Sequence, residues 1–343
     1  MTVAALPGNV RLRAFQIGAE TSWGTAVPAT RRLPLTFNPA FDLKVTFPTA
    51  DTGTLDRALA PYKMASDING QLTGPLAYND VPYLLSAVVK GGVTPTGAGP
   101  YTWTFQPAYT SQDVFQTFTA EVGDETADQY QLMGGVINQL QLQYPEDLGP
   151  VAVTADWYFA SINGGPNTSF TRTPGLQVDP SPNWVYAADT QLYIDSTAGG
   201  IEGTVLTNTM HGATVTLNDN LDKKRFANGS NTRFQLAGYG RGARLLTTNF
   251  TFAKSTVGIA EVANWLNANP VERFLGIRTV SPAIAGGATH YTMDLRFAGF
   301  WTANTYGTYA TGNTTDVLTC EGFIDQTLAY PFLFTAINSL SAL

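Results

Sequence analysis

The stretch RLLTTNFTFAKSTVGIAEVANWLNAN, residues 244–269, holds a strand pattern that runs directly into a helix pattern. Its first part alternates polar Asn249 and Thr251 with phenylalanines, the period of a strand that has one apolar face. Four apolar residues then follow at the i, i+3, i+4, i+7 spacing of one helix face: Ile259, Val262, Ala263 and Leu266. The stretch therefore predicts a strand and an amphipathic helix, with Ser255 or Thr256 as the N-cap and a stop at Asn269-Pro270.

The same unit occurs 178 positions earlier, where Gln71-Leu72-Thr73 precedes the run NDVPYLLSAVVKGG. Asn79 offers an N-cap there and Gly91-Gly92 a stop. Four apolar residues repeat the helix spacing: Val81, Leu84, Leu85 and Val88. We expect the same strand–helix unit twice, with the apolar face of each helix packed on its own sheet.

Other segments keep this order in both halves of the chain. Residues 190–195 match 14–18, residues 213–217 match 43–47, and each half has one long insertion, at 51–63 and at 218–230. At the offset of 178, Gln141 meets Thr319 and Gln143 meets Glu321. The pattern predicts an internal duplication.

Length and composition support two β-rich domains. The chain has 343 residues, only 13% of them charged, and 33 glycines, which suits strands joined by many turns. Residues 161–183 hold four prolines and little periodicity, as a linker does. We predict a mainly β protein with two tandem domains, residues 1–164 and 185–343, joined by a linker at 165–184. Each domain is expected to pack β-sheets in a sandwich-like or barrel-like way, with one flanking α-helix.

Charge and cysteine content exclude several classes of protein. The net charge is -7 and the sequence pI is about 4.8, which disfavours tight binding of nucleic acid. The single cysteine, Cys320, excludes an intrachain disulfide framework and is expected on the apolar face of a strand. There is no N-terminal signal pattern and no apolar run that could span a bilayer. We expect a protein made in a cytoplasm, without a targeting signal and without membrane contact.

A search for catalytic or ligand-binding patterns is negative. The two histidines, His211 and His290, have no second ligand at metal-binding spacing. Phosphate-binding glycine loops and a nucleophile elbow are absent. The acidic run EVGDETAD, residues 121–128, lacks EF-hand spacing and is better explained as a solvated loop. We therefore expect no enzyme activity, no catalytic residues, no cofactor and no metal.

The segment VINQLQLQY places three glutamines, Gln139, Gln141 and Gln143, on one strand face and leucines on the other. A row of uncharged polar side chains suits a wet face that lies close to a ligand or partner. An ordinary solvated strand face explains the segment equally well.

Two segments carry a resemblance to a known family. GAETSWGTAVPAT, residues 18–30, followed by a strand, resembles the N-terminal signature of tail tube (major tail) proteins of long-tailed, non-contractile bacteriophages. GGVINQLQL, residues 134–142, followed by VAVTADWYF at 151–159, is similar to that family's strand pair. The order of strands and helix is similar over nearly the whole chain. The resemblance implies a structural virion protein that forms stacked rings around a DNA channel.

Family rings usually have six such domains. A chain with two would form a trimeric, pseudo-hexameric ring, located in the phage tail and made in the cytoplasm of the host bacterium. The implied partners are other copies of the chain, the tape measure, tail terminator and distal tail proteins, and DNA in transit without tight binding.

The resemblance also assigns roles to residues. DNA must pass without being held, so neutral or acidic side chains suit the lumen. The candidates for the lumen are Gln71, Thr73, Gln139, Gln141, Gln143, Asn249, Thr251, Thr319 and Glu321. Either strand pair could face outward instead. The candidates for contacts between rings lie in the two insertions and are Asp51, Asp56, Arg57, Lys63, Lys223, Lys224 and Arg225.

Two other functions are also compatible with the sequence. A β-sandwich that binds carbohydrate or a cell surface is suggested by 12% aromatic residues, including six tryptophans. A hydrolase could use two of the clustered acids at 121–128, although no defined spacing favours it.

Overall fold

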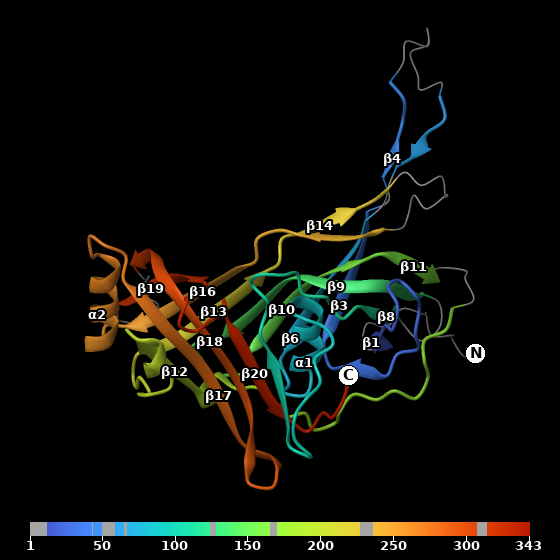
Figure 1. The fold of residues 1–343 in the computed structure, drawn as a ribbon. Helices are drawn as coiled ribbons and strands as arrows, with labels where there is room; N and C mark the ends of the chain where they lie inside the picture. Colours follow the sequence, from blue (N-terminus) through green and yellow to red (C-terminus); the bar gives the residue numbers. More distant parts are fainter. Residues whose placement is uncertain are drawn as a thin grey trace, which may run out of the picture.

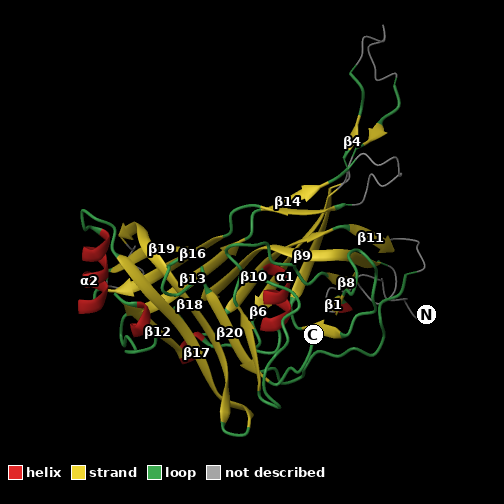
Figure 2. Ribbon diagram, viewed as in Figure 1, coloured by secondary structure: helices red, strands yellow, loops and turns green. Residues whose placement is uncertain are grey.

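The computed structural model describes residues 12–42, 44–49, 59–64, 67–123, 128–164, 170–226, 236–306 and 314–343. As predicted, the fold is mainly β, with large antiparallel sheets and two α-helices in the described residues (Figures 1 and 2).

The elements of the first half are β1 Ala14–Ala19, β2 Arg31–Leu33, β3 Thr36–Asp42, β4 Val45–Thr46, β5 Tyr62–Lys63, β6 Asp67–Pro75, α1 Val81–Val88, β7 Tyr101–Phe105, β8 Phe118–Gly123, β9 Gln129–Tyr144, β10 Ala152–Phe159 and β11 Ser161–Gly164. Those of the second half are β12 Thr190–Asp195, β13 Met210–Asn218, β14 Leu221–Lys224, β15 Gly238–Arg241, β16 Leu245–Ala253, α2 Thr256–Trp265, β17 Glu272–Gly286, β18 Thr289–Tyr306, β19 Thr315–Phe323 and β20 Leu333–Asn338. Two 3₁₀ turns, Ala187–Asp189 and Ala198–Gly200, flank β12.

Eight antiparallel strands form one continuous sheet, here called the central sheet, in the order β3-β6-β10-β9-β13-β16-β19-β18. The two halves of the chain meet in its middle, where β9 pairs with β13 and Gln141 lies opposite Thr216. Strands from the two halves therefore share one ladder of backbone hydrogen bonds.

Outer strands cover the apolar face of the central sheet. In the first half their order is β2-β1-β8-β9-β11, and in the second it is β12-β17-β18-β20-β7. The long strands β9 and β18 belong to both layers: their first residues pair with outer strands and their last with central strands. One connected core fills the space between, and Trp103, Trp157 and Phe250 are among its fully buried side chains.

The same strand order occurs in both halves. Seven strands of the first half have counterparts in the second. The pairs are β1 and β12, β3 and β13, β6 and β16, β8 and β17, β9 and β18, β10 and β19, and β11 and β20. The pairing shifts by one residue at equivalent points: Asn138 of β9 is the extra residue in its pairing with β10, and Thr302 of β18 is the extra residue in its pairing with β19. A bulge at the same place in each half of the sheet supports the predicted duplication.

Three of the predicted matches between the halves are wrong: those of Gln141 with Thr319, of Gln143 with Glu321, and of residues 43–47 with 213–217. Asn249 pairs with Thr319 and Gln71 with Asp156, so the counterpart of Thr319 is Asp156 and not Gln141. The counterpart of residues 213–217 is β3, not residues 43–47. An alternating pattern shows which residues share a face, but neighbouring strands carry the same alternation, so it cannot show which strand is the equivalent one.

Both helices are present where the spacing predicts them. Ser255 caps α2 by accepting a hydrogen bond from the Gly258 N–H at 3.1 Å, whereas the N-cap of α1 is Asp80 rather than Asn79. Every residue of α1 is buried, but on α2 only Gly258 and Glu261 are. Of the apolar face of α2, only the half-buried Val262 packs against the core, so the expected packing on its own sheet is wrong for Ile259, Ala263 and Leu266.

Candidate assembly surfaces

All nine candidates for the lumen lie on one face of the central sheet, here called the polar face. Side chains alternate between faces, and the cross-strand pairs place equal faces together. One row runs across seven strands through Thr36, Thr73, Thr154, Gln141, Thr216, Thr247 and Glu321. The row on one side holds Gln71 and Gln139, and the row on the other side holds Gln143, Asn249 and Thr319. Thr251 lies two residues beyond Asn249 on β16.

The two faces of the central sheet differ sharply in solvent exposure. None of the nine candidate residues is buried, whereas the residues between them, such as Leu72, Leu140 and Cys320, are at most 2% exposed. At the described ladder positions of the polar face, the charged side chains are all acidic: Asp42, Asp67, Asp156 and Glu321. This face is therefore wet and continuous, and its own strands carry no cation; Lys223 of the β14–β15 hairpin contacts it at Asn69 and Asp67.

The sequence pattern missed about half of the polar face. The additional members are Thr36, Asn38, Thr154, Asp156, Thr214, Thr216, Asn218 and Thr247. The alternation in ATVTL and VAVTADWYF contained this signal. What the sequence lacked was the strand order that joins the segments into one surface.

The central sheet ends in two strand edges. Among the described residues, β3 pairs only with β6, and it contains Pro39, a residue found mainly at sheet edges. At the other end, β17 pairs with β18 as far as Phe300, and beyond it residues 301–306 pair only with β19. The two edge strands are the counterparts of the strands that pair at the junction of the halves: β3 corresponds to β13, and the last part of β18 corresponds to β9.

The two insertions form hairpins at equivalent places, β4–β5 between β3 and β6, and β14–β15 between β13 and β16. The β14–β15 hairpin packs on the first half: the Tyr239 ring lies 5.2 Å from that of Trp23, and its hydroxyl donates to the Gly134 carbonyl at 3.3 Å. The β4–β5 hairpin extends away from the body (Figure 1). Its apolar side chains are 40–51% exposed: Val45, Phe47, Leu59, Tyr62 and Met64.

The candidates for contacts between rings have mixed outcomes. Lys223 and Arg225 contact Asp67 of their own chain at 3.4 and 2.7 Å, and Lys224 contacts Asp222. Burial disfavours the charged form of Asp67, but Arg225 and Lys223 outweigh it and lower its pKa. Lys223 and Arg225 thus meet an acid of the first half within one molecule, and Lys224 pairs with a residue of its own hairpin. Lys63 is exposed on β5, and Asp51, Asp56 and Arg57 lie outside the described residues.

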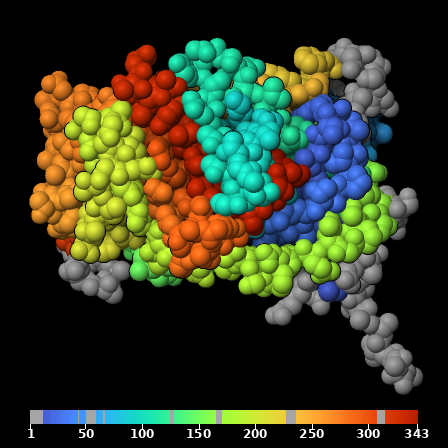
Figure 3. All heavy atoms as spheres, turned by 60° about the horizontal axis from the view of Figure 1, so that its bottom comes forward, coloured from blue at the N-terminus to red at the C-terminus, as the bar shows by residue number. Residues whose placement is uncertain are grey.

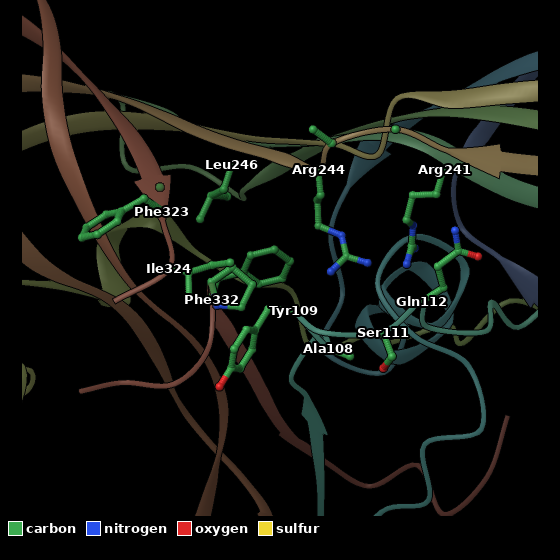
Figure 4. A pocket seen from close by; sticks show the side chains of 14 residues that line it. Ala108, Tyr109, Ser111, Gln112, Arg241, Arg244, Leu246, Phe323, Ile324 and Phe332 are labelled. Atoms are coloured by element: carbon green, nitrogen blue, oxygen red, sulfur yellow. The ribbon is translucent and has the colours of Figure 1, made fainter. Parts of the chain in front are cut away.

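A pocket of about 490 Å³ lies where the halves meet, lined by aromatic and apolar residues and by Arg241 and Arg244 (Figure 4). The two guanidinium groups donate to the buried carboxylate of Asp219 at 2.6 and 2.8 Å. Both also donate to the Val89 carbonyl, just past the end of α1. Because the cations are already paired, this network joins the halves rather than presenting a charged site to a ligand.

The motifs considered for chemistry are used structurally. Glu121 is 2% exposed and accepts hydrogen bonds from the Ala29 and Thr173 backbone. Trp103, Trp157 and Trp301 are buried, which weakens the aromatic argument for carbohydrate binding. Cys320 is buried as predicted, and burial raises the pKa of its thiol. In the described part of the chain no group of three or more potential metal ligands gathers, and no helix is long and apolar enough to cross a membrane.

No protein-family model and no curated protein sequence matches the chain. The features of the molecule that bear on function are the polar face, the two sheet edges and the repeated strand order.

Proposed function

We propose that the chain is a structural subunit that assembles head to tail into closed rings, and that stacked rings form the tail tube of a long-tailed, non-contractile bacteriophage. The observation that carries this proposal is the central sheet: eight strands with one continuous polar face and two edges that match the strands paired at its centre.

The junction of the halves provides the template for the contact between copies. There, Gln139 of β9 lies opposite Asn218 of β13, and Gln141 opposite Thr216. In the strand equivalence, Ala303 and Thr305 of β18 correspond to Gln139 and Gln141 of β9, and Asp42 and Ala40 of β3 correspond to Asn218 and Thr216 of β13. The same register between two copies would therefore put Ala303 opposite Asp42 of the next copy, and Thr305 opposite Ala40. Such pairing removes both exposed edges, which would otherwise invite uncontrolled aggregation.

Ring closure gives a channel of suitable size. Three chains supply roughly 24 strands, and at a spacing of about 4.8 Å and a tilt of about 40° these close into a barrel about 50 Å across at the backbone. The polar face lines this channel with neutral and acidic groups, and Lys223 and Arg225, which contact this face, are paired with Asp67, so DNA phosphates are not held. The tape measure, tail terminator and distal tail proteins are the proposed partners at the ends of the tube, and no enzymatic step is involved.

Cysteine cross-linking combined with electron microscopy tests the proposal. The double variant Ala40→Cys, Thr305→Cys places one thiol on each edge, and native Cys320 does not interfere because it is fully buried. We expect intermolecular disulfides that give a closed trimer on a denaturing gel, together with hollow rings or tubes in micrographs. The control Ala40→Cys, Val114→Cys carries an exposed thiol away from the β18 edge and should give no ladder. Compact monomers without cross-links across a concentration series would overturn the proposal.

A further inference from the structure

The helix α2 exposes an apolar face that its counterpart buries. Ile259 and Leu266 are 56% and 68% exposed, and Ala263 beside them is also exposed. The residues 178 positions earlier on α1, Val81, Leu85 and Val88, are at most 3% exposed. The same spacing of apolar residues thus lies in two different surroundings.

The face of α1 is covered by the other half of the chain. Leu84 and Leu85 share a small void with Met293 of β18 and Phe334 of β20, both outer strands of the second half. Next to the helix, the rings of Tyr78 and Tyr291 lie 5.6 Å apart, and Asn338 donates to the Tyr78 carbonyl at 3.0 Å. The helix α1 of the first half is therefore covered by outer strands of the second half.

The first half has an open groove whose lining includes Asp128, the counterpart of Met293. The outer strands β1, β8 and β9 stand where β12, β17 and β18 stand in the second half. Below them lies this groove of about 330 Å³, here called the β1–β3 groove, whose lining includes Phe15, Phe37, Val122, Asp128 and Tyr130. Phe15, Phe37 and Tyr130, with Leu35 and Val122, form an apolar part of its wall that suits an aliphatic helix face.

The helix and the groove lie at opposite ends of the molecule. Figure 1 shows α2 at one end and β1 and β8 toward the other, and in Figure 3 the orange segment at the left edge lies far from the blue segments at the right. The helix cannot reach the groove of its own chain. A second copy that pairs its β3 with this β18 brings its groove next to α2, as the second half brings its outer strands next to α1.

We propose that α2 of one copy docks into the β1–β3 groove of the next copy, with Ile259, Ala263 and Leu266 against the groove wall. The proposal rests on the proposed ring, because the pairing of β18 with β3 places the two surfaces together. The contact is heterologous, since the two copies use different surfaces. It therefore gives a closed ring only when the rotation from one copy to the next adds up to a full turn. The bound helix determines the angle between copies, which strand pairing alone leaves flexible.

Cross-linking between the helix and the groove provides the first arm of the test. Met293 lies beside Leu85 at the internal junction, and their counterparts at the proposed contact are Asp128 and Ala263, both exposed in the single chain. The variant Ala263→Cys, Asp128→Cys is expected to give intermolecular products with a short bis-maleimide. The variant Ala260→Cys, Asp128→Cys is the matched control, because Ala260 is exposed on another side of α2. It should give at least tenfold less product.

Charge substitution provides the second arm. Ile259→Asp and Leu266→Asp alter exposed side chains, so melting of the isolated chain is expected to stay unchanged while ring formation is lost. Ala260→Asp should assemble normally. Two outcomes would overturn the docking but leave the proposed function standing. One is normal ring formation by both apolar-face variants. The other is an edge disulfide between residues 40 and 305 without the cross-link between helix and groove. A wild-type chain that never associates would overturn both.

Discussion

The two helices of this protein have the same spacing of apolar residues but different surroundings. α1 lies in the middle of the molecule with all its residues buried, and α2 lies at one end with its apolar face in solvent (Figure 2). The difference comes from the neighbouring half: outer strands of the second half cover α1, and no described element covers α2 in the same way. A helix pattern thus determines which side needs a partner, and the tertiary structure determines whether the same chain supplies one.

The two helices are also anchored differently. The inward side of α2 carries Glu261, which accepts from Arg273 at 2.6 and 3.0 Å and from the Trp301 indole N–H at 2.8 Å. At the corresponding position α1 has Tyr83, with the Arg31 guanidinium 5.5 Å from its ring. This buried charged network, together with Val262 and Trp265 packed against the core, positions α2 and leaves Ile259, Ala263 and Leu266 available to another molecule.

The largest expected effect is on α1. Leu84→Ala removes a side chain that is 1% exposed, and it should lower the free energy of unfolding by about 4 kcal/mol because a cavity opens between the halves. Val262→Ala at the half-buried counterpart on α2 should cost about 1 kcal/mol. Urea unfolding of the isolated chain measures both values. Equal losses would show that the two helices are covered alike.

The anchor of α2 gives the next effect. Glu261→Gln leaves Arg273 with a neutral partner in a buried site, and the free energy of unfolding should fall by about 3 kcal/mol. Asp222→Asn is the matched control, since its pair with Lys224 is exposed and its loss should cost less than about 1 kcal/mol. Similar urea midpoints for the two variants would contradict an energetic role for the buried network.

The sequence predicted the local elements of this comparison better than their surroundings. The period of 3.6 located both helices, and the period of 2 placed Gln139, Gln141 and Gln143 on one face. Periodicity could not show that α1 is covered and α2 exposed, because that depends on contacts distant in sequence, such as Leu84 near Phe334. The polar face was predicted only in part for the same reason: Thr154 and Thr216 join it through a strand order that alternation does not encode.

A pH effect should distinguish the outer strands of the two halves. Burial raises the pKa of Asp294 to about 6, although the Arg296 guanidinium, 2.7 Å away, opposes the rise. The folded state then binds a proton that the unfolded state releases, so stability falls as the pH rises from about 4 to about 6, and it stays lower above that range. The change should be on the order of 2 kcal/mol.

Asp294→Asn should flatten this decline in a series of urea titrations between these pH values. The aligned position on β9 is occupied by Gln129, which does not titrate, so Gln129→Ala should leave the shape of the pH profile unchanged. A profile of Asp294→Asn that keeps the full slope would assign the effect to another group.

The smallest effect on the isolated chain is expected at Leu266, and it gives the sharpest contrast between the helices. Because 68% of the side chain is exposed, Leu266→Ala should change the free energy of unfolding of the monomer by less than about 0.5 kcal/mol. In the proposed ring the same side chain becomes buried, which is worth about 1.5–3 kcal/mol and corresponds to roughly a 10- to 100-fold weaker association. Sedimentation velocity over a concentration series measures the association, with Asn267→Ala, an exposed polar neighbour, as the control. A variant that unfolds and associates like the wild type would mean that the exposed face of α2 stays in solvent in the assembly, and that the covering of α1 is peculiar to the internal junction.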